Sequence, residues 1–221
     1  MRCRIISRVG GIPMGKFITL EGSDRSGKTT QARLLREYLS ARGVAFVWVR
    51  EPGGTELGEA LRRLLLDATR AEMDPVAELF LFAAARAQLV RKVIRPALAE
   101  GQVVLVERYT DSTVAYQGYG SGTDLGVVDL VNQWATGGTL PDLTIVLDAD
   151  PASLGGRRGE AASDRIEQRG LEFQRRVREG YRASAARDPE RVSVIDAARD
   201  VMAIHRDIVA RVETTLADSS Q

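Results

Sequence analysis

The sequence contains almost no cysteine, histidine or lysine, and the scarcity of cysteine excludes two kinds of site. One of its 221 residues is cysteine and one is histidine. An intrachain disulfide and a zinc site built from cysteines are therefore excluded. A chain that needs no disulfide fits a reducing compartment, and we expect the cytoplasm.

Charge of one sign and long apolar runs are lacking as well. Lys and Arg together number 31 and Asp and Glu 30, which gives a formal net charge of +1. Without an overall basic field we expect no binding to the backbone of nucleic acids. No apolar run is long enough to cross a bilayer, so we expect no membrane partner. Only Lys16, Lys28 and Lys92 are lysines, and codon bias explains most of the arginine excess.

Short apolar runs alternate along the chain with segments of helical periodicity. The runs cover residues 17–20, 44–49, 103–106, 143–147 and 192–195. Nearly continuous apolar runs are typical of parallel strands that helices cover on both faces. The alternation predicts an α/β fold, a doubly wound five-stranded parallel sheet surrounded by helices.

The same pattern predicts a single domain over residues 14–216. We expect residues 1–13 to form a disordered extension, with Met14 as an alternative start, and residues 217–221 to fray. The stretch 155–163 reads GGRRGEAAS. Its glycine, alanine and arginine content predicts a mobile loop.

A phosphate-binding loop is the clearest motif. Residues 22–29 read GSDRSGKT and match G-x-x-x-x-G-K-[ST] between an apolar run and an amphipathic helix. Glycines let backbone N–H groups face an anion, and the helix N-terminus adds partial positive charge. Lys28 is expected at the β- and γ-phosphates and the Thr29 hydroxyl on Mg²⁺. The predicted ATP-binding residues are Gly22, Ser23, Asp24, Arg25, Ser26, Gly27, Lys28, Thr29 and Thr30.

Two classes of nucleotide-binding protein lack their signatures here. GTPases commonly read the base with an Asn-Lys-x-Asp segment, but no lysine follows Lys92. The protein-kinase signatures are also missing from the sequence. Small-molecule phosphotransferases and ATPases remain.

Six stretches, in one order, resemble the bacterial thymidylate kinase family, whose members phosphorylate dTMP to dTDP. They are FITLEGSDRSGKTTQ (17–31), REPGGT (50–55), LFAAAR (81–86), ERYTDSTVAYQG (107–118), PDLTIVLD (141–148) and DRIE (164–167). The likeness covers residues 15–213. It implies a P-loop nucleoside monophosphate kinase with a mobile lid near residues 155–166. It also implies ATP and dTMP as substrates, Mg²⁺ as cofactor and a homodimer.

The resemblance also implies an acceptor site. The implied dTMP-binding residues are Asp24, Arg50, Phe82, Arg86, Arg108, Ser112, Tyr116 and Gln117. Arg50 and Arg108 are implied at the acceptor phosphate, where a guanidinium offers a bidentate fork. Asp24 is implied at the 3′-hydroxyl.

The base and sugar have their own implied contacts. Phe82 and Arg86 lie four residues apart on one helix face, and the family match implies stacking on thymine and a hydrogen bond to its O4. On the pattern alone Phe82 fits ordinary core packing. Tyr116 is implied beneath the sugar, where it leaves no room for a 2′-hydroxyl. Ser112 and Gln117 are implied near the base edge.

The predicted catalytic residues neutralise charge, because phosphoryl transfer depends mainly on positioning and electrostatics. They are Lys28, Arg25, Arg108 and Glu107. Glu107 directly follows the run 103–106 and is predicted to be a Walker-B-like acid. Together with Thr29 it would hold Mg²⁺, in its case through water. The family usually has Asp at that place.

A transition-state arginine has two candidate origins. The family carries it either in the P-loop, as Arg25 would be, or in the lid. The lid candidates are Arg157, Arg158 and Arg165. We predict Arg25 as the main catalytic arginine because the P-loop would hold it rigidly.

Two alternatives stay open. One is a nucleoside monophosphate kinase with another base preference, such as uridylate. The other is a nucleotide-binding regulatory ATPase without transferase activity, which Glu107 and the departure of the lid from the family pattern would favour.

Overall fold

The computed structural model describes residues 15–69, 73–154 and 164–217. The predicted extension at residues 1–13, the loop 155–163 with Arg157 and Arg158, and residues 218–221 lie outside this part of the chain. No helix among the described residues is long and apolar enough to cross a membrane.

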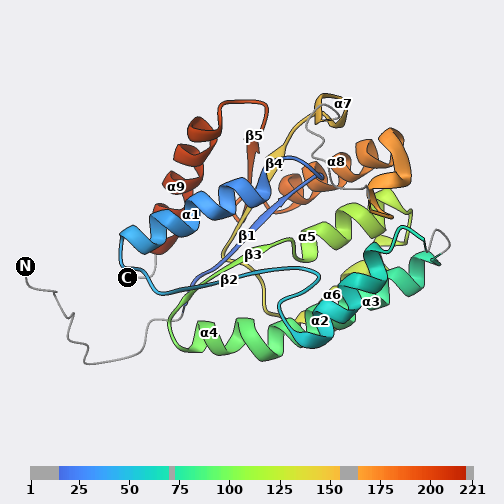
Figure 1. Cartoon of the computed structure of the whole chain (residues 1–221), viewed down its shortest axis with the longest axis horizontal. Helices are drawn as coiled ribbons and strands as arrows, with labels where there is room; N and C mark the ends of the chain where they lie inside the picture. The colour runs from blue at the N-terminus through green and yellow to red at the C-terminus, as the bar shows by residue number, and fades with distance from the viewer. Residues whose placement is uncertain (1–14, 70–72, 155–163, 218–221) are drawn as a thin grey trace, which may run out of the picture.

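Five parallel strands form one sheet in the order β2-β3-β1-β4-β5 (Figure 1). They are β1 (Phe17–Gly22), β2 (Phe46–Arg50), β3 (Val103–Glu107), β4 (Leu143–Asp148) and β5 (Val192–Asp196). The five-stranded doubly wound sheet predicted from the sequence is thus confirmed. Each strand runs one or two residues beyond the predicted carboxyl end. The added residues are glycine or charged, so the apolar pattern stops short of them.

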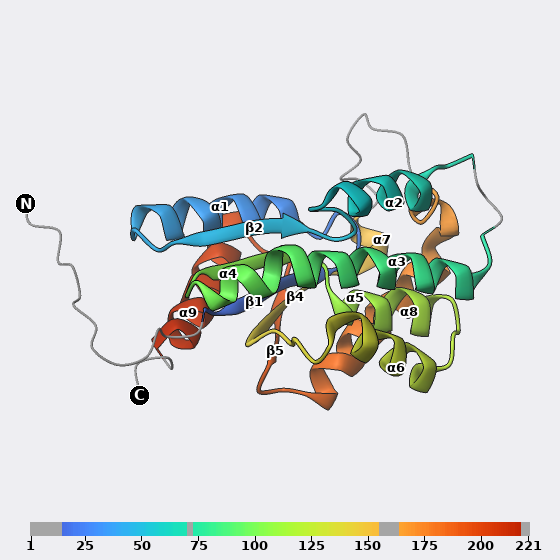
Figure 2. The same ribbon diagram turned by 90° about the horizontal axis from the view of Figure 1, so that it is seen from below.

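Helices occupy the connections between the strands. They are α1 (Lys28–Ala41), α2 (Glu56–Leu66), α3 (Pro75–Leu89), α4 (Arg95–Ala99), α5 (Thr110–Thr113), α6 (Leu125–Thr136), α7 (Pro151–Leu154), α8 (Gly170–Arg187) and α9 (Val201–Ala217). The described residues also include two π-helical segments, η1 (Val90–Ile94) and η2 (Val114–Gly120), and the 3₁₀ turn η4 (Glu167–Arg169). The segments α3, η1 and α4 follow one another as one long rod (Figure 2).

Helices cover both faces of the sheet. On one face α1 and α9 pack against Ile18 and Leu20. On the other, the end of α3, η1 and α4 pack against Phe17 and Val104. Because neighbouring strand residues point to opposite faces, burial on both sides explains runs without polar alternation. The edge strand β2 differs from this expectation, since its residues are only partly buried.

The pair Asp74-Pro75 begins α3. The Asp74 carboxylate accepts hydrogen bonds from the backbone N–H groups of Val76 at 2.8 Å and Ala77 at 3.2 Å. Pro75 occupies the first turn, where its missing N–H has no helical partner to lose. This helix carries Phe82 and Arg86 toward the carboxyl ends of the strands.

Candidate active site

The phosphate loop joins β1 to α1 at the carboxyl edge of the sheet. Gly22 has a φ of 135°, and a Cβ there would lie 2.5 Å from the carbonyl oxygen of Leu147. Gly27 precedes α1 in a left-handed conformation. Only glycine takes such conformations without strain, so these two positions explain the glycines of the motif.

Lys28 lies folded against this loop. Its Nζ donates to the carbonyl oxygens of Gly22 at 3.0 Å and Ser23 at 2.8 Å. Burial, and next the Arg108 guanidinium, lower the pKa of Lys28 to about 7, although nearby carboxylates oppose the shift. The lysine is therefore about half charged at neutral pH when no phosphate is bound.

Thr29 and Glu107 meet across the strand ends. The Thr29 hydroxyl donates to Glu107 Oε2 at 2.8 Å. The indole N–H of Trp48 donates to Glu107 Oε1 at 3.1 Å and fixes the carboxylate from the other side. No motif in the sequence indicated this contact of Trp48.

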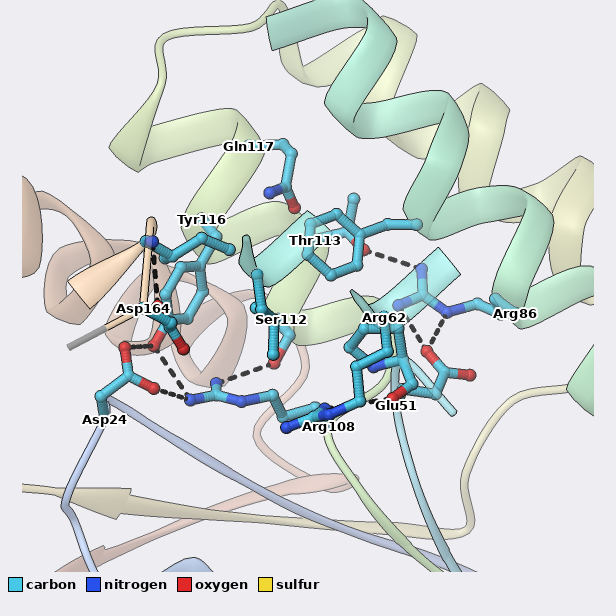
Figure 3. Close-up of a pocket in the computed structure, with 14 residues that line it drawn as sticks. Asp24, Glu51, Arg62, Arg86, Arg108, Ser112, Thr113, Tyr116, Gln117 and Asp164 are labelled. Carbon is cyan, nitrogen blue, oxygen red and sulfur yellow. Dashed lines mark hydrogen bonds and ion pairs between the residues drawn. The ribbon is translucent and has the colours of Figure 1, made fainter. Parts of the chain in front are cut away.

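A pocket opens beside the phosphate loop, between α3, α5, η2 and the ends of β2 and β3 (Figure 3). Its lining residues are Asp24, Glu51, Pro52, Arg62, Leu66, Phe82, Arg86, Arg108, Ser112, Thr113, Tyr116, Gln117, Asp164 and Ile166. The structure thereby brings together every implied dTMP-binding residue except Arg50.

Asp24, Arg108 and Tyr116 connect this pocket to the phosphate loop. Arg108 Nη2 forms an ion pair with Asp24 and donates to the Tyr116 hydroxyl at 3.1 Å. That hydroxyl donates to Asp24 Oδ2 at 3.0 Å. Burial raises the pKa of Asp24 and Arg108 lowers it, with a net shift downward, so the carboxylate is ionised at neutral pH. Figure 3 shows the three side chains meeting at one end of the pocket.

Arg25 and Arg108 share an unusual backbone. Among the described residues other than glycine, only these two have positive φ, at 65° and 70°. Such conformations cost free energy and cluster at functional sites. Both arginines were predicted as catalytic from the sequence.

Arg86 is nearly fully buried at the opposite end of the pocket, and all three of its nitrogens have partners. Nε donates to Glu51 Oε2 at 2.8 Å, and Nη1 donates to Thr113 and Asn132, each at 2.7 Å. Nη2 lies 2.8 Å from Glu51 and donates to the Tyr109 carbonyl at 2.9 Å. A hydrogen bond from Arg86 to a base must share or replace one of these bonds.

Glu51 binds Arg86 from a buried position that disfavours its own charged form. Burial raises the pKa of Glu51 to about 7 despite the Arg86 guanidinium. Its Oε1 is buried without a hydrogen-bond partner in the described structure. The motif REPGGT contains Glu51, but sequence reasoning assigned it no role.

Arg62, and not Arg50 as implied by the resemblance, lines the pocket. Arg50 is half exposed and pairs with Glu59 at 3.5 Å, and it does not line the pocket. Arg62, on α2, lines the pocket and donates to the Pro52 carbonyl at 3.1 Å. Its position on the polar side of a predicted amphipathic helix gave no signal in the sequence.

The arginine candidates for catalysis have distinct surroundings. Arg25 Nη2 lies 2.7 Å from Glu167 Oε2, just before α8. Arg165 is buried against Glu78 and the Leu65 carbonyl. Its guanidinium therefore serves a buried ion pair rather than an open lid.

A second cavity lies over the other side of the phosphate loop. Residues 25–31 of the loop and α1 line it together with Ala197, Arg199 and Val201, which follow β5. Ala197 and Arg199, in the loop after β5, thus lie next to the predicted ATP-binding residues.

Glu21 is a further buried acid that sequence reasoning missed. Its carboxylate accepts from the Tyr109 N–H at 2.6 Å, the Ser112 hydroxyl at 2.5 Å and the Tyr181 hydroxyl at 3.0 Å. Burial, and next Asp111, raise the pKa of Glu21. The acid organises the segment after β3, which carries Arg108 and Ser112.

The site offers oxygen donors suited to a hard cation. Within the described ranges no group of three or more His, Cys, Asp or Glu side chains gathers to hold a metal. The Thr29 hydroxyl and the Glu107 carboxylate lie 2.8 Å apart at the phosphate loop. Mg²⁺ typically takes one or two protein oxygens together with substrate phosphates, so these residues fit it.

Known proteins have sequences similar to that of this chain. A family model described as thymidylate kinase matches residues 20–208. The thymidylate kinase of Pelotomaculum thermopropionicum is 51% identical over 204 residues, covering 91% of this chain and 94% of that protein. That of Roseiflexus castenholzii is 47% identical over 222 residues, covering 94% and 97%.

A solved structure extends the comparison to three dimensions. The crystal structure of thymidylate kinase from Ehrlichia chaffeensis superposes with a TM-score of 0.75 and 37% sequence identity. The match covers 91% of this chain and 99% of the other. Together with the phosphate loop and the adjoining pocket, these likenesses show that the chain belongs to the thymidylate kinase family.

Proposed function

We propose that the protein transfers the γ-phosphoryl group of ATP to the 5′-monophosphate of dTMP, which yields dTDP and ADP. One observation carries the proposal. Asp24 is part of the phosphate loop and also lines the neighbouring pocket, where it contacts Arg108 and Tyr116. A donor on the loop and an acceptor in the pocket would therefore adjoin one another.

The residues at that junction suit phosphoryl transfer. Lys28 and Arg108 place two cationic groups where two phosphate chains would meet, which lowers the repulsion between them. An acceptor phosphate oxygen attacks the γ-phosphorus in line, so no protein nucleophile is required. Arg62 adds a third cation at the pocket wall. We assign it to the acceptor phosphate in place of Arg50.

Mg²⁺ belongs to the proposal. Thr29 would hold it directly and Glu107 through water, and the ion would neutralise charge on the β- and γ-phosphate oxygens. Trp48 keeps the Glu107 carboxylate turned toward Thr29.

A direct test is to detect both products. The enzyme is incubated with ATP, Mg²⁺ and dTMP, and nucleotides are separated by ion-exchange chromatography. Equal amounts of dTDP and ADP are expected, with none from Lys28→Met after its fold is checked by thermal melting. ATP binding without dTDP would favour the regulatory ATPase instead.

We further propose that two copies of the chain pair through α3 and α6, which pack against each other. Trp134 on α6 is 77% exposed, and further large apolar residues on the two helices are also exposed. They are Val76 and Phe80 on α3 and Val127 and Leu130 on α6. An exposed apolar patch of this kind marks an interaction surface. Light scattering should give a dimer for the wild type and a monomer for Trp134→Arg; a wild-type monomer would contradict the pairing.

A further inference from the structure

A buried carboxylate lies behind the end of the pocket that would hold the nucleotide base. Glu78, on α3, is 0% exposed. Its Oε1 accepts from Gln117 Nε2 at 2.8 Å. Its Oε2 pairs with Arg165 and Arg169. Glu78 therefore joins a residue that lines the pocket to two arginines beside α8.

The chemistry of this contact fixes the orientation of the Gln117 amide. An ionised carboxylate can only accept hydrogen bonds, whereas an amide can either donate or accept. Two guanidinium groups on Oε2 balance the Glu78 charge, so the amide must turn its NH₂ toward Oε1. Its own oxygen then points the opposite way. Figure 3 shows the Gln117 oxygen facing the pocket, and no described residue donates a hydrogen bond to it.

An acceptor fixed at this wall distinguishes pyrimidines by their ring position 3. Thymine and uracil carry an N–H there, whereas cytosine carries a lone pair. A donor facing Gln117 Oε1 would form a hydrogen bond, and a lone pair would leave two acceptors opposed. Sites built to hydrogen-bond a substrate reject analogues that leave a buried polar group unpaired.

We infer that Glu78 is a positioning residue that locks the Gln117 amide as an acceptor and thereby selects acceptor nucleotides with an N–H at ring position 3. The inference rests on the proposed function, because it needs a pyrimidine in this pocket. Glu78 contacts no substrate and acts through Gln117.

Glu78→Gln is the decisive variant. A glutamine at position 78 can present either end of its amide, so Gln117 is free to turn its NH₂ toward the pocket and donate to cytosine. We expect the ratio of kcat/KM for dTMP to that for dCMP to fall by about tenfold or more. A folded variant that keeps the wild-type ratio would overturn the inference.

Arg169→Gln is the matched control. It removes a cation from Glu78 Oε2 but leaves the carboxylate facing Gln117, so it weakens the same buried cluster without freeing the amide. We expect the dTMP to dCMP ratio to stay within about threefold of the wild type. An equal fall in both variants would mean that Glu78 matters only for packing, which overturns the inference.

Gln117→Leu covers the case in which Glu78→Gln fails to fold, as judged by thermal melting. It leaves the arginine pairs of Glu78 in place. The kcat/KM for dTMP should fall by about tenfold or more, while that for dCMP should not fall, because leucine removes the acceptor that opposes the cytosine lone pair; equal losses overturn the inference. A wild type that makes no dTDP overturns both this inference and the proposed function. Wild-type dTDP formation with unmoved ratios overturns the inference alone.

Discussion

Thr29 donates its hydroxyl to Glu107 across 2.8 Å, and this contact ties the start of α1 to the end of β3. The first turn of the phosphate-loop helix and the end of the neighbouring strand thus bring side-chain oxygens close together. Glu107 accepts from this hydroxyl with one carboxylate oxygen and from Trp48 with the other. A glutamate where the family usually has aspartate is therefore compatible with a role near the metal.

Glu107→Gln should raise the Mg²⁺ concentration that gives half-maximal activity. Loss of an outer carboxylate typically weakens metal binding by about 10- to 100-fold, and KM for dTMP should change little because Glu107 does not line the acceptor pocket. Titration of ADP release with Mg²⁺ measures the shift. Trp48→Phe, which removes the indole donor but keeps an aromatic ring, should move it in the same direction and by less. An unchanged Mg²⁺ requirement in Glu107→Gln would remove Glu107 from the metal site.

Lys28 should take up a proton when ATP binds. Burial holds its pKa at about 7 in the free protein, and a polyphosphate beside it favours the ammonium form. About one proton per ATP should be bound at pH 8, and about half a proton at pH 7. Calorimetry in buffers of different ionisation enthalpy measures the uptake.

The same pKa shift affects stability without nucleotide. The pKa of Lys28 is lowered from 10.5 in the unfolded chain to about 7 in the folded one. Between these values the unfolded state binds more protons, so this residue makes the free energy of unfolding rise with pH. Lys28→Met should flatten that rise and abolish the proton uptake. Uptake that persists in Lys28→Met would assign it to another group.

Arg25→Ala tests the origin of the transition-state arginine. Loss of such a residue lowers kcat by about 10³-fold or more, and KM for dTMP should change far less. Glu167→Gln is the matched control, because it removes the partner of Arg25 at 2.7 Å but keeps the arginine. We expect its kcat to stay close to the wild type. Near-normal kcat in Arg25→Ala, with a collapse in Arg157→Ala, would reverse the assignment.

Tyr116→Ala should admit ribonucleotides. The Tyr116 hydroxyl lies between Asp24 and Arg108, and its ring would fill the space that a 2′-hydroxyl needs. Removal of the ring should raise kcat/KM for UMP relative to dUMP. Tyr116→Phe retains the ring and should keep the wild-type preference. If both variants discriminate like the wild type, Tyr116 does not control the sugar.

Much of the fold can be predicted from the sequence because burial of the strands imposes a simple apolar pattern. Strands covered on both faces must be apolar throughout, so the runs beginning at residues 17, 103 and 143 marked their strands directly. The apolar pattern ends before the carboxyl end of each strand, where charged residues still take part in the hydrogen-bonded pairing of the sheet. Glu107, for example, pairs in register with Leu20 and Arg50. These polar ends build the active site, so the apolar pattern fails at the functional edge.

The site was predicted where residues form contiguous motifs and missed where distant segments meet. Asp24, Arg108 and Tyr116 belong to motifs that the resemblance covers. Arg62 and Glu78 lie on helices, and only tertiary packing shows that one faces the pocket and the other supports Gln117. Hydrophobic periodicity shows which face of a helix is apolar. It does not show which of the polar residues on the helix becomes buried when the helix packs against other elements.

The most direct test of the account is a coupled assay of ADP release by the wild-type enzyme with five acceptors, dTMP, dUMP, UMP, CMP and AMP. In the proposed mechanism Lys28, Arg62 and Arg108 would serve any monophosphate, whereas Tyr116, Gln117 and Arg86 would select the sugar and the base. We predict the highest kcat/KM with dTMP, a lower value with dUMP and far lower values with the three ribonucleotides. Faster turnover of UMP than of dTMP would contradict the assigned specificity, and no turnover of any acceptor despite ATP binding would contradict the assigned reaction.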